Sequence, residues 1–146
     1  MMFRRLIATA PVWFTVPVRL TLGLIFIGHG AQKVLGAFGG RGLSASVAGD
    51  APWFFMRPSW LWLGAAALSE FIGGILILAG LLTRVGAFLI AVTMFVAIFA
   101  VHWPNFFLTN RGIEFALALL GMAVALVIAG GGKLSVDQLL SGGRRR

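Results

Sequence analysis

The stretch LTLGLIFIGHGAQKVLGAFGG, residues 20–40, begins as an apolar membrane helix and ends with polar residues and glycines. Residues 20–27 carry a single polar side chain, whereas His29, Gln32 and Lys33 follow within the next six residues. A transmembrane helix tolerates such groups where they are paired, hydrated or close to the membrane surface. The stretch therefore predicts a membrane-spanning helix whose polar end belongs to a binding site or a packing site.

The composition places the whole chain in the integral membrane class. Of its 146 residues, 60% are hydrophobic and 11% are charged, whereas about 25% of the residues of a soluble domain are charged. The net charge of +8 comes from residues at helix ends, where Lys and Arg set topology and contact anionic lipid. We therefore do not expect nucleic-acid binding. The chain has no cysteine, which excludes disulfides and thiol chemistry within it.

Four apolar segments have the length of membrane spans. Each is close to the ~20 residues that cross ~30 Å of hydrocarbon, and in lipid the backbone must satisfy its own hydrogen bonds. We therefore predict an all-α, integral membrane four-helix bundle with a long outer loop between its first and second helices. The predicted spans are 17–35, 60–82, 85–103 and 112–129.

Both ends of the chain are predicted to lie outside this four-helix domain, residues 17–130. Two prolines interrupt the apolar start, so we expect residues 1–16 to form an interfacial segment rather than a cleaved signal peptide. Residues 131–146 are expected to form a basic cytoplasmic tail. Within this tail, Ser135 and Gln138 have the spacing of a helix capping box.

The distribution of Lys and Arg predicts the orientation of the helices. With both termini inside, seven basic residues lie at the inner surface and four at the outer surface. The inner set is Arg4, Arg5, Arg84, Lys133 and Arg144–Arg146, and the outer set is Lys33, Arg41, Arg57 and Arg111. We therefore predict a multi-pass protein with both termini in the cytoplasm.

This topology brings ionisable side chains from all four helices into the outer half of the bundle. Glu70 lies ten residues after Trp60, about 15 Å deep and near the membrane midplane. A carboxyl group at that depth is either protonated or paired with a cation such as Lys33 or Arg111. We therefore predict a site in this region. Its candidate catalytic residues are Glu70, His29 and Glu114, and its candidate ligand-binding residues are His29, Gln32, Lys33, Glu70, His102 and Arg111.

Glycines near the polar end of the first helix have two predicted roles. Gly28 and Gly30 thin the helix so that neighbouring helices can approach it closely. Gly36, Gly39 and Gly40 end the helix and let the following loop fold back over the site.

Most of the polar residues also have a purely structural explanation. Lys33 can extend to the outer interface, and His29 can form a hydrogen bond between helices. Glu114 can complement the dipole of the fourth helix and pair with Arg111. His102 can be an ordinary interface histidine. A mid-span carboxyl group is the hardest to explain in this way, because burying it without a role is costly.

The sequence gives little support for a metal or a nucleotide. His29, His102 and two glutamates supply metal-ligand types, but no local pair such as His-x-x-x-His accompanies them. A haem between the two histidines is a weaker alternative. The glycine-rich run follows a membrane helix rather than a strand, which argues against a nucleotide-binding loop. We expect no tightly bound metal or nucleotide.

Longer segments resemble the DoxX family of small bacterial membrane proteins. The segment RLTLGLIFIGHGAQKVLGAFGGRG, residues 19–42, resembles the start of the family pattern. Residues 68–107 resemble its second and third helices, with a Glu-x-x-Gly-Gly element that begins at Glu70. Residues 112–140 resemble its fourth helix, with a Gly-x-Gly-x-x-Ser-x-Asp ending at Asp137.

This resemblance implies a four-helix protein of the bacterial inner (plasma) membrane. Members of the wider group occur with thiosulfate:quinone oxidoreductase, and others with sulfurtransferase and superoxide dismutase partners. We therefore predict a membrane subunit of a redox system that binds a quinone or a similar small apolar molecule; if it is an enzyme, it is a quinone-linked oxidoreductase subunit. The expected partners are the lipid bilayer and other membrane, periplasmic or cytoplasmic redox subunits, and a homo-oligomer is left open. The alternatives are a non-catalytic structural or assembly subunit and a small transport or lipid-handling protein.

Overall fold

The computed structural model describes residues 6–142, and every regular element in that range is a helix. The all-α prediction is therefore confirmed for these residues. Arg4, Arg5 and Arg144–Arg146, which carry much of the predicted orientation signal, lie outside the described residues. The four long helices are α2 (Thr15–Val34), α4 (Ser59–Ala79), α5 (Thr83–Ala97) and α6 (Glu114–Ala129). The shorter elements are η1 (Ala37–Gly39), α3 (Gly42–Val47), the π-helical turn η2 (Ile98–His102), η3 (Leu108–Asn110) and α7 (Val136–Gly142).

Two to three of these helices qualify as membrane spans by length and apolar composition. Ser59–Ala79 and the continuous segment Thr83–His102 qualify alone. Thr15–Val34 qualifies only together with Ala37–Val47, and the two parts are bent by 88°. The 16 residues of α6 extend about 24 Å, which is less than the ~30 Å of hydrocarbon. The chain is thus a membrane protein with two to three candidate spans, and a four-span bundle remains a prediction.

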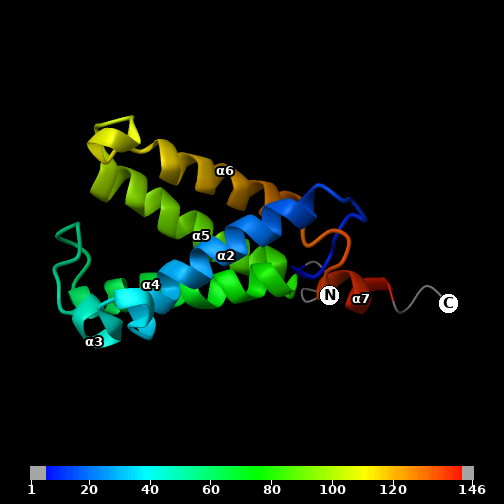
Figure 1. The fold of residues 1–146 in the computed structure, drawn as a ribbon, viewed down its shortest axis with the longest axis horizontal. Coiled ribbons are helices and arrows are strands. Elements are labelled where there is room, and N and C mark those ends of the chain that lie inside the picture. The colour runs from blue at the N-terminus through cyan, green and yellow to red at the C-terminus, as the bar shows by residue number, and fades with distance from the viewer. Residues whose placement is uncertain (1–5, 143–146) are drawn as a thin grey trace.

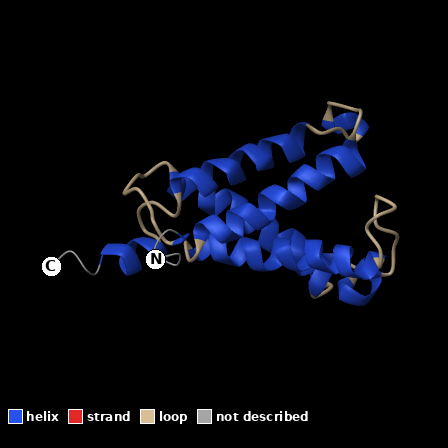
Figure 2. Cartoon of the chain, turned by 180° about the vertical axis from the view of Figure 1, so that it is seen from behind, coloured by secondary structure: helices blue, strands red, loops and turns tan. Residues whose placement is uncertain are grey.

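The long helices pack in chain order, α2 against α4, α4 against α5 and α5 against α6. Figure 1 shows the chain reversing direction at each connection, with α7 at the end where α2 begins. The α5–α6 hairpin diverges from the α2–α4 pair toward the opposite end, where η3 and α3 lie well apart. Figure 2 shows the same divergence from behind. The helices that sequence reasoning placed around one outer site therefore end at two separate tips.

Small residues allow α2 and α4 to approach closely. A Cβ atom at Gly30 would overlap Phe71 of α4, at 2.6 Å from its Cβ, and one at Gly74 would lie 2.7 Å from the backbone nitrogen of Ile27. By contrast, a Cβ atom at Gly28 would meet nothing within 4 Å. The predicted thinning of the helix is therefore confirmed for Gly30 and is wrong for Gly28, because Gly28 faces away from α4.

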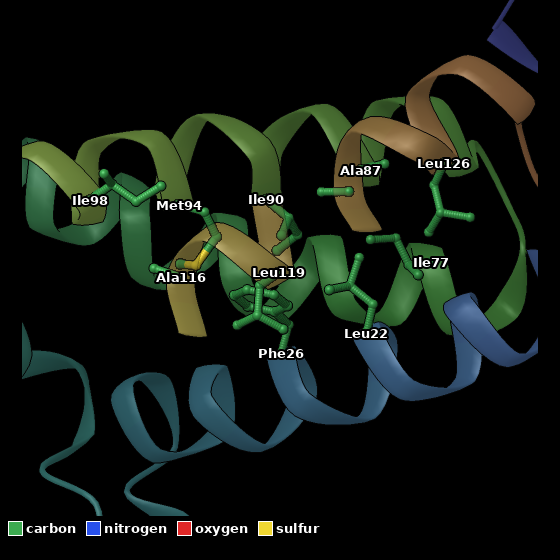
Figure 3. Packing of buried hydrophobic residues seen from close by; sticks show 11 residues of the cluster. Leu22, Phe26, Ile77, Ala87, Ile90, Met94, Ile98, Ala116, Leu119 and Leu126 are labelled. Atoms are coloured by element: carbon green, nitrogen blue, oxygen red, sulfur yellow. The ribbon is translucent and has the colours of Figure 1, made fainter. Parts of the chain in front are cut away.

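The hydrophobic core lies where all four long helices converge (Figure 3). Leu22 and Phe26 of α2 meet Ile77 of α4, together with side chains of α5 and α6. Outside this core many large apolar side chains are exposed on the helices, for example Phe88, Phe95 and Ile128. Such a surface is expected for helices that contact lipid, since lipid tails are as apolar as the side chains.

The loop after α2 turns back toward the helix. Gly36 and Gly39 adopt φ values of 70° and 75°, in the left-handed region that glycine enters without steric cost. The following helix α3 packs against both α4 and α2. The prediction that glycines end the helix and fold the loop back over its polar end is therefore confirmed.

Candidate functional site

A partly buried ion pair joins α2 to α4. The ammonium group of Lys33 donates hydrogen bonds to both carboxylate oxygens of Glu70, with Nζ–O distances of 2.6 and 2.7 Å. The Glu70 side chain is 4% exposed, whereas that of Lys33 is 44% exposed. The structure thus realises one of the two states expected for Glu70, pairing with a cation, and selects Lys33 rather than Arg111 as its partner.

Local sequence explains why this pair forms. Glu70 and Gly74 are four residues apart and lie on the face of α4 that packs against α2. The small Gly74 lets the two backbones approach, so that the Lys33 side chain reaches the carboxylate without leaving the helix interface. Gly73, one residue earlier, faces Gly86 and Ile90 of α5 instead. The Glu-x-x-Gly-Gly element therefore serves two helix contacts at once.

A groove of about 330 Å³ runs along α2 on the side of α6. Two polar side chains, His29 and Gln32, line it together with apolar residues of α2, the η1 turn and the start of α6. The complete lining is Leu24, Ile25, Gly28, His29, Gln32, Phe38 and Phe115. The His29 side chain is exposed and Gln32 is half-buried. The groove therefore combines an apolar wall with hydrogen-bonding groups from one turn of α2.

The remaining predicted site residues gather at the tip of the α5–α6 hairpin. The Nδ1 atom of His102 lies 2.7 Å from the carbonyl oxygen of Arg111, so this nitrogen carries the proton and donates it. Glu114 accepts a hydrogen bond from the backbone N–H of Leu108 at 2.5 Å. Among the described residues Arg111 and Glu114 form no ion pair. These contacts hold the hairpin loop together.

The structure thus divides the predicted cluster in two. Lys33 and Glu70 are joined, and His29 and Gln32 lie beside them on α2. His102, Arg111 and Glu114 instead form contacts within the α5–α6 hairpin, although Phe115, the residue after Glu114, lines the groove that contains His29 and Gln32. The physical reason is the divergence of α5 and α6 from the α2–α4 pair, which helix lengths and membrane depth do not reveal.

Sequence reasoning missed a second polar centre at the opposite end of the molecule. Asp137 of α7 is 1% exposed and its carboxylate accepts three hydrogen bonds from the turn between α4 and α5. The donors are Leu82 N at 2.8 Å, Thr83 N at 2.9 Å and Thr83 Oγ1 at 2.7 Å. In return the backbone N–H of Asp137 donates to the carbonyl of Gly80 at 2.8 Å. An acidic side chain here stabilises the start of α5, where backbone N–H groups lack partners within the helix.

Arg19 of α2 binds the segment that precedes α7 at the same end of the molecule. It is 2% exposed, and its Nη2 donates to the carbonyls of Leu134 at 2.8 Å and Lys133 at 3.3 Å. Its Nε and Nη1 have no hydrogen-bond partner among the described residues. Thr15 adds a hydrogen bond to the carbonyl of Gly131 at 3.1 Å. The first part of the predicted tail is therefore packed into the membrane-helix domain.

The capping box predicted in this segment is confirmed in its first half, the Ser135 cap, whereas the Gln138 side chain reaches the residue before the cap. The N–H of Gln138 donates to Ser135 Oγ at 3.1 Å, and Gln138 Oε1 accepts from Leu134 N at 3.1 Å. The Gly-x-Gly-x-x-Ser-x-Asp pattern, together with this box, was the signal in the sequence for the Asp137 contact. The pattern predicts a capped helix after a glycine turn, but it does not say which other part of the chain that helix will meet.

Comparison with known proteins agrees with the resemblance seen in the sequence. The family model DoxX matches residues 14–103, a range that includes the Lys33–Glu70 pair and the α4–α5 turn. A protein of Bacillus subtilis (strain 168), named "Putative oxidoreductase CatD", is 31% identical over 131 residues, which is 90% of each chain. No solved structure matches. The chain therefore belongs to the DoxX family.

Proposed function

We propose that this protein is a membrane subunit of a redox system and binds a quinone, or a similar small apolar molecule, in the groove between α2 and α6. The observation that carries the proposal is the lining of this groove. His29 and Gln32 supply hydrogen-bonding groups beside Leu24, Ile25 and Phe115. The neighbouring residue Lys33 holds a buried carboxylate.

The groove has the size and polarity that a quinone head group requires. Its volume of about 330 Å³ lies at the lower end of the roughly 300–1,000 Å³ typical of ligand pockets, which are mostly apolar with a few placed polar groups. An imidazole N–H of His29 and the amide NH₂ of Gln32 are both donors, and a quinone carbonyl is an acceptor. The exposed Leu24 and Phe115 offer contacts for an apolar ring or tail.

Protons and electrons would come from different sources. Reduction of a quinone to a quinol takes up two electrons and two protons. Lys33 lines the neighbouring cavity rather than this groove, so proton exchange between the Lys33–Glu70 pair and a group bound at His29 would run through a bridging water molecule. The chain has neither cysteine nor tyrosine, so the electrons would be delivered by a partner subunit or a bound reductant. The name of the Bacillus subtilis relative, an oxidoreductase, fits this role.

We further propose the complete architecture that the sequence predicts. Residues 17–130 would form four spans in a bacterial inner membrane, with both termini in the cytoplasm, residues 1–16 interfacial and residues 131–146 cytoplasmic. The support is that the two ends of the described chain meet. Ala10 N donates to Ala129 O at 3.4 Å and Lys133 N to Val12 O at 3.0 Å. An even number of crossings must separate segments that lie on one side.

The binding site is tested with the full chain in detergent and a short-chain quinone as the probe. His29→Ala should weaken binding about 2- to 13-fold, because one hydrogen bond contributes about 0.5–1.5 kcal/mol. His102→Ala is the matched control, since this histidine lies at the hairpin tip, and it should bind the quinone as wild type does. Equal affinity of all three proteins would refute the site.

A second function is favoured by a separate observation. Glu70 is paired with Lys33, and Asp137 accepts hydrogen bonds from the α4–α5 turn, so both carboxylates have partners within the chain. This is what we expect of polar groups whose role is to stabilise helix packing. In that case the protein would be a structural or assembly subunit. Purification in mild detergent distinguishes the two: stable co-purification with larger subunits and no quinone binding supports the assembly role.

A further inference from the structure

A second and larger cavity lies beneath the loop that follows α2. Its volume is about 770 Å³. The walls come from the end of α2, the loop and α3, and one turn of α4. The lining includes Gln32, Lys33, Arg41, Ser46, Asp50 and Ala67. Most of the loop residues in this lining are exposed, so the cavity is open on the side of the loop.

The acidic groups at this cavity already have cationic partners. Asp50 accepts a hydrogen bond from Arg57 at 2.8 Å, and Glu70, behind the wall, is paired with Lys33. Arg41 forms no ion pair with any residue in the described range. Its positive charge is therefore not balanced by an acidic side chain at the cavity.

One ammonium donor at the cavity is not used by the described contacts. An ammonium group has three N–H donors, and the described contacts of Lys33 use two of them, both on Glu70. A guanidinium group presents a planar fork that matches a carboxylate. Leu63, Ala66 and Ala67 of α4 supply an apolar part of the cavity lining, the α4 floor.

We propose that this cavity is a binding site for a small carboxylate with an apolar body, taken from the aqueous phase. Arg41 binds the carboxylate, the third N–H of Lys33 and the amide of Gln32 complete its hydrogen bonds, and the apolar body rests on the α4 floor. Charge complementarity selects an acid over a neutral or cationic molecule. The cavity volume lies within the usual range for ligand pockets.

This site has its own charged residues, Arg41 and Lys33, and only the Gln32 amide would serve both this site and the quinone groove. The two cavities share Gln32 alone among their lining residues. Two ligands could therefore bind on opposite sides of one α2 side chain. A variant of Arg41 should not affect the quinone groove, and a variant of His29 should not affect the acid site.

The test uses the detergent-solubilised full chain with 4-fluorobenzoate as the probe, followed by fluorine NMR, and 4-fluorobenzamide as its neutral isostere. Wild type should bind the acid saturably and at least fivefold more tightly than the amide. Arg41→Gln should remove that preference, whereas Arg111→Gln, which alters an exposed arginine at the other tip, should keep affinity within about twofold of wild type. Empty micelles measure partitioning into detergent.

Three outcomes would overturn the proposal. They are equal binding of acid and amide by wild type, equal affinity of wild type and Arg41→Gln, and binding no greater than in empty micelles. The thermal midpoint of each variant is measured alongside, and a folded Arg41→Gln protein is expected because the side chain is exposed. His29→Ala should leave acid binding unchanged, so that failure of the quinone site and failure of the acid site are distinguished.

Discussion

The Lys33 ammonium contacts both carboxylate oxygens of Glu70, at 2.6 and 2.7 Å, across the interface of α2 and α4. One partner is almost fully buried and the other is nearly half exposed. This asymmetry means that the two residues cannot be exchanged or removed with equal effect. Lys33 can turn toward water when its partner is lost, whereas Glu70 is left in an apolar environment.

The first prediction is a double-mutant cycle on this pair. Lys33→Met should lower the free energy of unfolding by about 1–3 kcal/mol, because a buried carboxyl group loses its partner. Glu70→Gln should cost less, since Lys33 remains hydrated. The double variant should be more stable than the sum of the two single effects predicts. Thermal or denaturant unfolding in detergent measures all four proteins, and strict additivity would show that the pair is not coupled.

The second prediction concerns Asp137 and the α4–α5 turn. Asp137→Ala should destabilise the fold by about 1.5–3 kcal/mol, because three donors lose a charged acceptor. Asp137→Asn should fall between this variant and wild type, because it keeps one carbonyl oxygen. Ser141→Ala, on an exposed residue of the same helix, is the control and should have little effect. Limited proteolysis should cut the α7 region of Asp137→Ala sooner; an unchanged cleavage rate would contradict the proposed anchoring.

The third prediction uses two glycines on one helix. Gly30→Ala should cost about 1–3 kcal/mol, because its new methyl group would overlap Phe71 and force α2 and α4 apart. Gly28→Ala should be neutral or slightly stabilising, since the added methyl group meets nothing within 4 Å and alanine favours the helix. Thermal unfolding compares the two variants directly. A Gly30→Ala protein as stable as Gly28→Ala would mean that the helices do not approach closely there.

The fourth prediction tests the proposed topology. The absence of cysteine makes single-cysteine variants unambiguous reporters. In intact cells a membrane-impermeant maleimide should label Ser44→Cys in the outer loop and should not label Ser141→Cys near the C-terminus. Permeabilised cells should show labelling at both positions. The reverse pattern in intact cells would invert the proposed orientation. Labelling of both positions in intact cells would exclude the three crossings proposed between them, because two residues on one side are separated by an even number of crossings.

Much of the architecture follows from the sequence because it depends on the apolar composition of each segment and on interactions between residues close together in the chain. Sustained apolar segments can satisfy their backbone in lipid only as helices, so the helical segments at residues 15–34, 59–79, 83–97 and 114–129 lie close to the predicted spans. The Gly36–Gly40 turn and the Ser135 cap were also predictable, because glycine conformation and helix capping act within a few residues.

The site was only partly predictable, because its contacts join residues far apart in the chain. The depth of Glu70 predicted that its carboxyl group is either protonated or paired with a cation, and in the structure it is paired with Lys33, 37 residues away. Depth alone also grouped His102 and Glu114 with this pair. Depth says nothing about the lateral separation of helices, and that separation places them at another tip.

The sequence by itself therefore determined that this protein is helical, belongs in a membrane and carries costly polar groups that require a reason. Only the tertiary structure decided which of those polar groups pair with one another. Close packing of α2 and α4 at Gly30 and Gly74 brings Lys33 within reach of Glu70. The packing of α7 against the α4–α5 turn lets Thr83 donate a hydrogen bond to Asp137. Both contacts depend on where the helices lie relative to one another. A buried polar group needs a partner because leaving it unpaired is costly, but its position in the sequence does not say which residue that partner is.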